Sequence, residues 1–121
     1  MNKTELGSFG ENLAAEYLEQ EGYRILERNF RCRMGEIDLI ACRKQILTFV
    51  EVKLRKDSRH GEAREFVTEA KQRKLRMAAS YYLMNHPSAE ELQMRFDVIE
   101  IYAPRGREGP VQLNLLENAF E

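Results

Sequence analysis

Asp38, Glu51 and Lys53 are three residues whose types and spacing could support chemistry. Carboxylates are hard oxygen ligands that suit Mg²⁺ or Mn²⁺, with water filling the remaining coordination positions. A bound divalent cation polarises a phosphate group and lowers the pKa of a coordinated water. The ammonium group of a nearby lysine can stabilise developing negative charge or help to deprotonate that water. If the fold brings the three side chains together, they would suit metal-assisted hydrolysis of a phosphodiester.

Two short apolar segments, 35–42 and 46–54, carry these residues. Both are rich in Ile, Val and Phe and are predicted to be buried strands. A two-residue turn at 44–45 would join them as an antiparallel hairpin. A slip by one residue would separate the acidic side chains onto opposite faces, so the register without the slip is favoured. The resulting pairs on the partly ionic face are Cys42–Leu47, Ile40–Phe49, Asp38–Glu51 and Glu36–Lys53.

Two carboxylates directly opposite each other on a sheet repel, and burial makes that repulsion costly unless a cation compensates for it. Lys53 is one candidate cation, because it lies two residues from Glu51 on the same face. A divalent metal ion is the other candidate. The alternative to a metal site is a buried ion-pair triad formed by Asp38, Glu51 and Lys53.

The first helix is predicted over 4–21, because its apolar residues recur at helical spacing. Gly22 follows as a residue that commonly ends a helix. Wound at 100° per residue, the segment has Ala14 and Leu18 at the margin of its apolar face. The residues predicted to line that face are Leu6, Phe9, Leu13 and Tyr17.

A second helix is predicted from an N-cap at Thr68 to about Asn85, after a basic loop at 55–65. The remaining segments are predicted as strands at 23–31 and 94–102, a loop at 103–110, and an edge strand or core cover at 111–120. The order predicts a single α/β domain spanning 1–121, with an αβββαβ core and a central mixed sheet flanked by helices.

The composition excludes several classes of protein. The 121 residues suit one domain, 43% of them are apolar and 32% are charged. No apolar run approaches the ~18 residues that span a membrane, and the N-terminal segment lacks the apolar stretch of a secretory signal. Cys32 and Cys42 make neither a disulfide framework nor a zinc ligand set. We therefore expect a cytoplasmic protein without a membrane partner.

Charge is distributed unevenly along the chain. Residues 1–23 and 77–121 each carry a net charge of −4, whereas residues 24–76 carry +7. A basic region between acidic ends can bind a polyanion, although a solvated surface is the alternative. The candidate nucleic-acid-binding residues in this region are Arg55, Lys56, Arg59, Lys71, Arg73, Lys74 and Arg76.

Asp38 followed by Glu51-Val52-Lys53 resembles the D…(D/E)xK signature of the PD-(D/E)xK nuclease superfamily. Restriction endonucleases and archaeal Holliday-junction resolvases belong to that superfamily. A larger set of motifs is similar to the YraN-type family of small bacterial proteins, which resembles the resolvases. These motifs are G-S-F-G-E-N-L-A-A-E-Y-L at 7–18, G-Y at 22–23, N-F-R at 29–31, G-E-I-D-L-I at 35–40, F-V-E-V-K at 49–53 and R-F-D-V at 95–98.

The resemblance implies a restriction-endonuclease-like fold and a role for each motif residue. Asp38 and Glu51 would bind Mg²⁺ or Mn²⁺, with the carbonyl group of Val52 as a third ligand. Lys53 would be the catalytic lysine. Glu11 matches the helix-1 glutamate that often completes such a site. The alternative for that residue is a purely structural capping box, Ser8-x-x-Glu11.

Two further residues have supporting roles in this interpretation. Glu36 shares the face of Asp38 and is either an accessory ligand or the ion-pair partner of Lys53. Gln72, like Lys71, lies near the start of the second helix, where related nucleases often place groups that contact phosphate or support the site.

The resemblance therefore implies a hydrolase, a Mg²⁺-dependent endodeoxyribonuclease that acts on structured or branched DNA. Because a two-fold junction requires two cuts, we expect a homodimer. The alternative function is a non-catalytic nucleic-acid-binding or adaptor protein that retains the fold.

Overall fold

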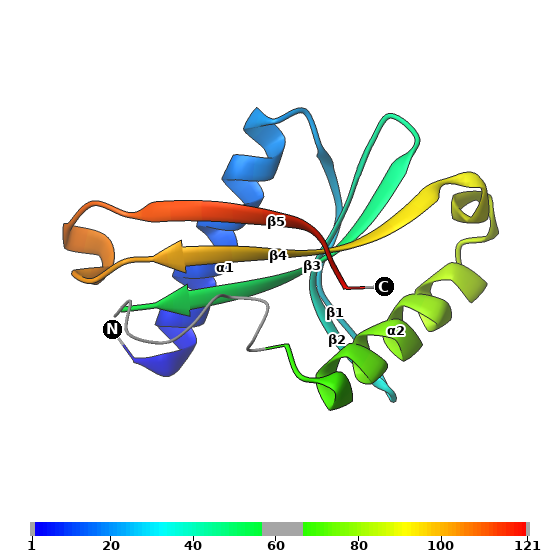
Figure 1. Ribbon diagram of the computed structural model, residues 1–121, viewed down its shortest axis with the longest axis horizontal. Coiled ribbons are helices and arrows are strands. Elements are labelled where there is room, and N and C mark those ends of the chain that lie inside the picture. The colour runs from blue at the N-terminus through cyan, green and yellow to red at the C-terminus, as the bar shows by residue number, and fades with distance from the viewer. Residues whose placement is uncertain (1, 57–66, 121) are drawn as a thin grey trace.

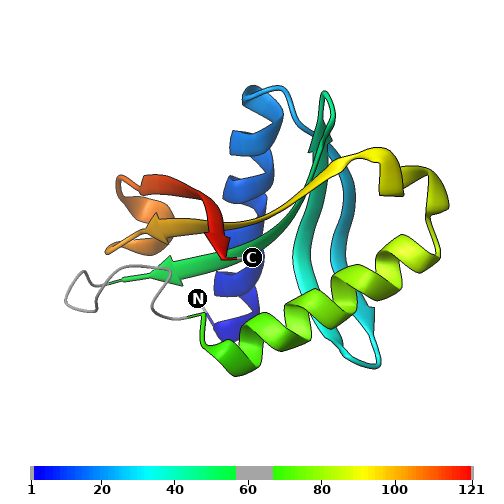
Figure 2. The same ribbon diagram turned by 45° about the vertical axis from the view of Figure 1, so that its right-hand side comes forward.

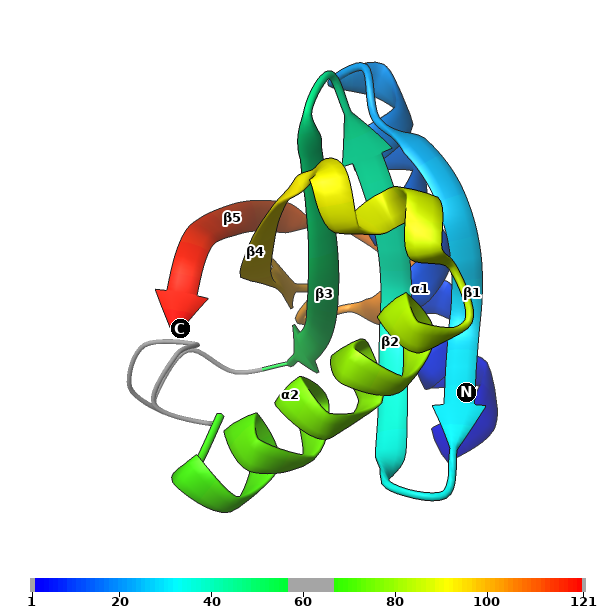
Figure 3. The ribbon, with the colours of Figure 1, turned by 90° about the vertical axis from the view of Figure 1, so that its right-hand side faces the viewer.

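A five-stranded mixed sheet separates two helices that lie on its opposite faces (Figures 1 and 3). The computed structural model describes residues 2–56 and 67–120. The helices are α1 (Lys3–Gln20) and α2 (Glu69–Met84), with short 3₁₀ turns at η2 (Pro87–Glu91) and η3 (Gly106–Glu108). The strands are β1 (Arg24–Cys32), β2 (Gly35–Arg43), β3 (Ile46–Arg55), β4 (Gln93–Tyr102) and β5 (Gln112–Phe120). None of the helices in the described ranges is long and apolar enough to cross a membrane.

The strands lie in the sheet in the order in which they occur in the chain. Neighbouring strands are antiparallel except β3 and β4, which are parallel. A parallel pair needs a long connection, and α2 lies within the connection between β3 and β4. This arrangement confirms the predicted αβββαβ core and the predicted edge strand near the C-terminus.

Local signals define both helices. The side chain of Asn2 accepts a hydrogen bond from the N–H of Glu5 at 2.8 Å and caps α1. Gly22 has φ +91°, and the N–H of Tyr23 donates to the carbonyl of Leu18, as in a Schellman ending. In α2, Thr68 caps the N–H of Lys71 at 3.2 Å, as predicted.

The buried face of α1 differs from the predicted one. Ala14, Ala15 and Leu18 are fully buried, whereas the four residues predicted to line the face are only partly buried. Small side chains allow the helix axis to approach the sheet, and a Cβ at Gly10 would lie 3.4 Å from the Cβ of Leu54. Phe9, Leu13 and Tyr17 do pack against the core as predicted, but the centre of the buried face lies at the small residues rather than at the largest apolar ones.

The β2–β3 hairpin has the predicted turn and register in its first half. Arg43 pairs with Ile46, and the ladder continues to the pair Leu39–Val50. The ladder ends there, so the predicted pairs Asp38–Glu51 and Glu36–Lys53 do not form. Figure 2 shows the lower part of the β1–β2 hairpin diverging from β3 beyond this point.

The carboxylate of Asp38 accounts for the end of the ladder. Its Oδ2 accepts a hydrogen bond from the N–H of Val52 at 2.8 Å. A side chain thus satisfies a donor that would otherwise need a backbone partner on β2. Leu39 packs in the core cluster on the α1 side of the sheet, and strict alternation would place Ile37, two residues earlier, on that same side. Ile37 instead packs in the core cluster on the α2 side. Asp38 therefore lies in a fork where two parts of the sheet separate.

Candidate functional site

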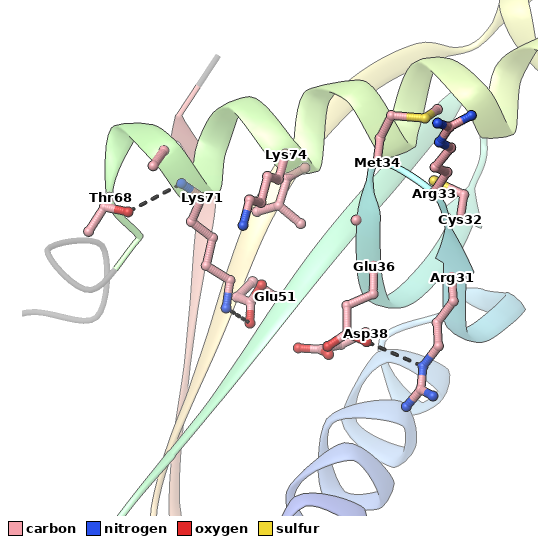
Figure 4. A pocket seen from close by; sticks show the side chains of 13 residues that line it. Arg31, Cys32, Arg33, Met34, Glu36, Asp38, Glu51, Thr68, Lys71 and Lys74 are labelled. Carbon is pink, nitrogen blue, oxygen red and sulfur yellow. Dashed lines mark hydrogen bonds and ion pairs between the residues drawn. The ribbon is translucent and has the colours of Figure 1, made fainter.

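A cavity of about 690 Å³ opens between the β1–β2 hairpin and the N-terminal half of α2 (Figure 4). Asp38 enters it from β2 and Glu51 from β3, so the fork brings both predicted metal ligands to one site. Lys71 and Lys74 reach it from α2, and Arg31 lines it from β1. The cavity therefore has carboxylates at the fork and basic side chains on both walls.

Glu51 is a buried carboxylate whose charge is only partly compensated. Its side chain is 8% exposed, and its Oε1 lies 3.0 Å from the Nζ of Lys71. Burial, and secondarily the nearby charge of Asp38, raise the pKa of Glu51 to about 7, whereas Lys71 opposes the shift. Placing two carboxylates together thus makes the ionised form of Glu51 costly, which is the situation that a bound cation would relieve.

The two lysines beside Glu51 are shifted in opposite directions. Burial lowers the pKa of Lys53, and the positive charge of Lys71 lowers it further, while Glu51 opposes the change. Burial would also lower the pKa of Lys71, but its direct contact with Glu51 raises that pKa overall. Lys71 is therefore the more firmly protonated of the two.

Glu36 does not pair with Lys53, which corrects one of the two alternatives given for it. Its Oε2 lies 3.2 Å from the Nε of Arg31, and both side chains are well exposed. The reason is the divergence of the hairpin from β3, which leaves Glu36 beside β1. Glu36 still lines the cavity with Asp38.

The donor set fits a hard divalent cation in its chemistry. Asp38 and Glu51 interact directly, since the charge and a side-chain hydrogen bond of Asp38 both affect Glu51. Across the parts of the chain that the structure describes, no group of three or more His, Cys, Asp or Glu side chains could hold a metal. Water would therefore complete the coordination, which suits Mg²⁺ because that ion keeps several of its waters.

Glu11 lies on the other side of Asp38, facing the sheet from α1. Its side chain is 14% exposed and lies 3.8 Å from Arg28. It lines a second cavity of about 610 Å³ together with Asp38. The alternative capping box is wrong, because Ser8 lies inside α1 and Asn2 is the N-cap. The rotation of α1 toward its small residues is what turns Glu11 inward.

The other predicted residues are distributed over different parts of the fold. Gln72 donates from its Nε2 to the carbonyl of Val67 at 2.9 Å and so fixes the start of α2. Arg55 forms an ion pair with Glu100 on β4. Arg59 lies outside the described residues, as does most of the predicted loop at 55–65. The exposed candidates are Lys56, Arg73, Lys74 and Arg76.

The second basic wall of the cavity was not predicted from the sequence. Arg31, Arg33 and Met34 line it at the tip of the β1–β2 hairpin. Their signal is the short basic run R-C-R at 31–33, at the turn between the predicted strands 23–31 and 35–42. Lys71 was expected either on a nucleic-acid surface or among the groups that support the site, and the structure brings its ammonium group directly to Glu51.

The comparisons with known proteins concern almost the whole chain. The model of the uncharacterised protein family UPF0102 matches residues 10–101. A UPF0102 protein of Caldicellulosiruptor bescii is 43% identical over 120 residues, covering 99% of this chain and 100% of the relative. A UPF0102 protein of Symbiobacterium thermophilum is 49% identical over 115 residues, covering 95% of each chain. The resemblance to the YraN-type family is thereby confirmed, and the chain belongs to the uncharacterised protein family UPF0102.

Proposed function

We propose that this protein is a metal-dependent endonuclease that hydrolyses phosphodiester bonds in structured or branched DNA. The observation that carries the proposal is the pairing of Asp38 and Glu51 in one fork, with two lysines beside them and basic walls around them. Perturbed titratable groups that line a cavity are typical of functional sites.

Asp38 and Glu51 would hold Mg²⁺ or Mn²⁺, which would polarise the phosphate and lower the pKa of a bound water. Burial lowers the pKa of Lys53, which makes the exchange of a proton at its Nζ easier than for an ordinary lysine. Lys71 stays protonated and suits the stabilisation of negative charge on a phosphate oxygen. The two lysines would therefore have different tasks at the same site.

The walls would hold the nucleic acid. Arg31 and Arg33 on the hairpin and Lys74 on α2 line the same cavity. Basic side chains of this kind contact phosphates, position the strand and make binding depend on salt. A two-fold symmetric junction would need two such sites, and we therefore propose a homodimer on that substrate, which sedimentation with and without junction DNA would measure.

Cleavage of branched DNA tests the proposal. Wild-type protein with Mg²⁺ or Mn²⁺ should cut a labelled four-way junction, and Asp38→Ala and Lys53→Met should each reduce the rate by at least about 100-fold. Lys44→Met is the matched control, since Lys44 lies in the exposed turn at the other end of the hairpin. The nuclease proposal fails if the wild type cuts none of a set of junction, flap and single-stranded substrates, or if both site variants cut as fast as the control.

A non-catalytic nucleic-acid-binding function is the second candidate. The observation in its favour is the contact between Lys71 and Glu51, because the ammonium group of Lys71 can compensate the charge of that carboxylate without a metal ion. This function predicts salt-sensitive binding of the same substrates with no cleavage in any divalent cation. Binding unaffected by Asp38→Ala would support it over the nuclease.

A further inference from the structure

The two cavities beside Asp38 adjoin each other. The α2-side cavity of about 690 Å³ and the α1-side cavity of about 610 Å³ share Arg31, Glu36 and Asp38 as lining residues. Asp38 lies in the fork of the sheet, so one cavity opens from it toward α2 and the other toward α1. A strand whose phosphate lay at Asp38 would therefore have space on both sides.

The two cavities differ in charge. Arg31, Arg33, Lys71 and Lys74 line the α2-side cavity, and they outnumber its three acidic residues. Among the described residues that line the α1-side cavity, Glu11, Glu36 and Asp38 meet a single basic residue, Arg31. Phosphates are therefore favoured on the α2 side and disfavoured on the α1 side.

The α1-side cavity is lined by polar and apolar groups together, a combination that suits a nucleobase, whose apolar faces are bounded by polar edges. Val52 and Leu54 supply apolar atoms from β3. Gly7 and Gly10 line it without side chains, and a Cβ built at Gly7 would have nothing within 4 Å. Its carboxylates can accept hydrogen bonds from the amino groups of a nucleobase, as acidic side chains do at cytosine.

We propose that the α1-side cavity holds the base of the nucleotide next to the scissile phosphate, while the α2-side cavity holds the phosphates. A base can enter a cavity between a helix and a sheet only when it is free of its duplex partner. The substrate class is then a nucleic acid with an unpaired nucleotide at the cut, such as a flap, a branch point or a single strand. This inference rests on the proposed function and specifies its substrate.

Gly7→Leu tests the inference by filling the α1-side cavity. The substitution replaces a glycine within α1 by a better helix former, so the fold should be retained. Binding is measured by fluorescence anisotropy of a labelled single-stranded DNA oligonucleotide in Ca²⁺. Gly7→Leu should weaken binding by about tenfold, in line with the loss of one base contact. Gly7→Ala should have a smaller effect, and Gln20→Leu, on the exposed side of α1, should have none.

Two results would overturn the inference. One is unchanged binding by Gly7→Leu, and the other is equally tight binding of the same strand when it is fully paired. If Asp38→Ala still abolishes cleavage in either case, the proposed nuclease stands and only the base site is wrong. If the wild type neither binds nor cleaves any nucleic acid, both the base site and the proposed function are wrong.

Discussion

Two clusters of charged side chains are built on the same sheet, and their surroundings differ. The Asp97 cluster consists of Asp97, Arg95, Thr48, Tyr23 and the backbone of Asn118. The carboxylate of Asp97 is fully buried and accepts hydrogen bonds from Thr48 Oγ1 at 2.7 Å, from Arg95 Nε and Nη2 at 2.9 Å, and from the Asn118 N–H at 3.0 Å. Arg95 also donates to the hydroxyl group of Tyr23. Each charge in this cluster has an opposite charge and several hydrogen bonds.

The Asp38 cluster consists of Asp38, Glu51, Lys53 and Lys71. Here two carboxylates interact with each other, two ammonium groups interact with each other, and a cavity lies beside them. A fully satisfied polar network stabilises and specifies a fold, whereas repulsion maintained beside a cavity indicates a binding or catalytic role. The Asp97 cluster is therefore part of the fold's stabilising network, and the Asp38 cluster is the candidate site of the proposed function.

The largest expected change in stability follows the removal of the buried carboxylate of Asp97. Asp97→Ala leaves the buried guanidinium of Arg95 without its main partner and should destabilise the protein by about 3–5 kcal/mol. Urea unfolding at pH 7 measures this change. Glu117→Ala is the control, because Glu117 lies 3.7 Å from Arg95 but is half exposed. A loss of under about 1 kcal/mol in Asp97→Ala would contradict a structural role.

Stability should also depend on pH through Glu51. Its pKa is about 7 in the folded protein and 4.5 ordinarily, so the folded state binds more protons between these values. Stability should therefore fall as the pH rises from about 4.5 to about 7, by on the order of 3 kcal/mol. Urea midpoints across this range measure the slope, and Glu51→Gln should abolish it and be more stable than wild type at pH 8. The same slope in wild type and Glu51→Gln would show that another group causes it.

Removing the ammonium group of Lys71 beside Glu51 should lower the stability by a smaller amount. Lys71→Met leaves the ionised carboxylate buried without its ion-pair partner and should cost about 1–3 kcal/mol at pH 8. At pH 5, where Glu51 is protonated, the cost should be smaller. Lys74→Met is the matched control, since Lys74 is an exposed lysine on the same helix. An equal loss in both variants would mean that the contact with Glu51 contributes nothing specific.

A divalent cation should stabilise the Asp38 cluster alone. Mg²⁺ at ten times its dissociation constant should stabilise the wild type by about 1.4 kcal/mol and raise its Tm. Asp38→Asn keeps an acceptor for the N–H of Val52 but removes a charge, so its Tm should not respond to Mg²⁺. Thermal unfolding with and without the cation measures both. An equal response in the two proteins would place the binding site elsewhere.

Local signals predicted most of the fold. Thr68 before an amphipathic segment and Gly22 after one defined the ends of two helices, and the turn at 44–45 defined a hairpin. These features depend on residues close together in the chain. The divergence of β2 from β3 could not be predicted in this way, because it depends on the carboxylate of Asp38 taking the N–H of Val52.

The two carboxylates of the candidate site could be predicted from the sequence, whereas the side chains around them could not. Asp38 and Glu51 lie on neighbouring strands just beyond the last pair of the predicted ladder, Leu39–Val50, so the hairpin brings them near each other although they do not pair. Lys71 comes from a helix about 20 residues further along, and its contact with Glu51 depends on how α2 crosses the sheet. The Asp97 cluster depends equally on contacts between distant strands, since Thr48 and Asn118 approach Asp97 from β3 and β5.

The smallest expected effect is that of substituting Glu36, which belongs to neither cluster. Its ion pair with Arg31 is well exposed, and pairs of this kind contribute less than about 0.5 kcal/mol to stability. Glu36→Gln should therefore leave the urea midpoint and the Mg²⁺-dependent rise in Tm unchanged, with Glu16→Gln on the exposed side of α1 as the control. A reduced response to Mg²⁺ at unchanged stability would instead make Glu36 an accessory ligand. Because its carboxylate lines the cavities on both sides of Asp38, that result would extend the metal site across the fork toward Glu11.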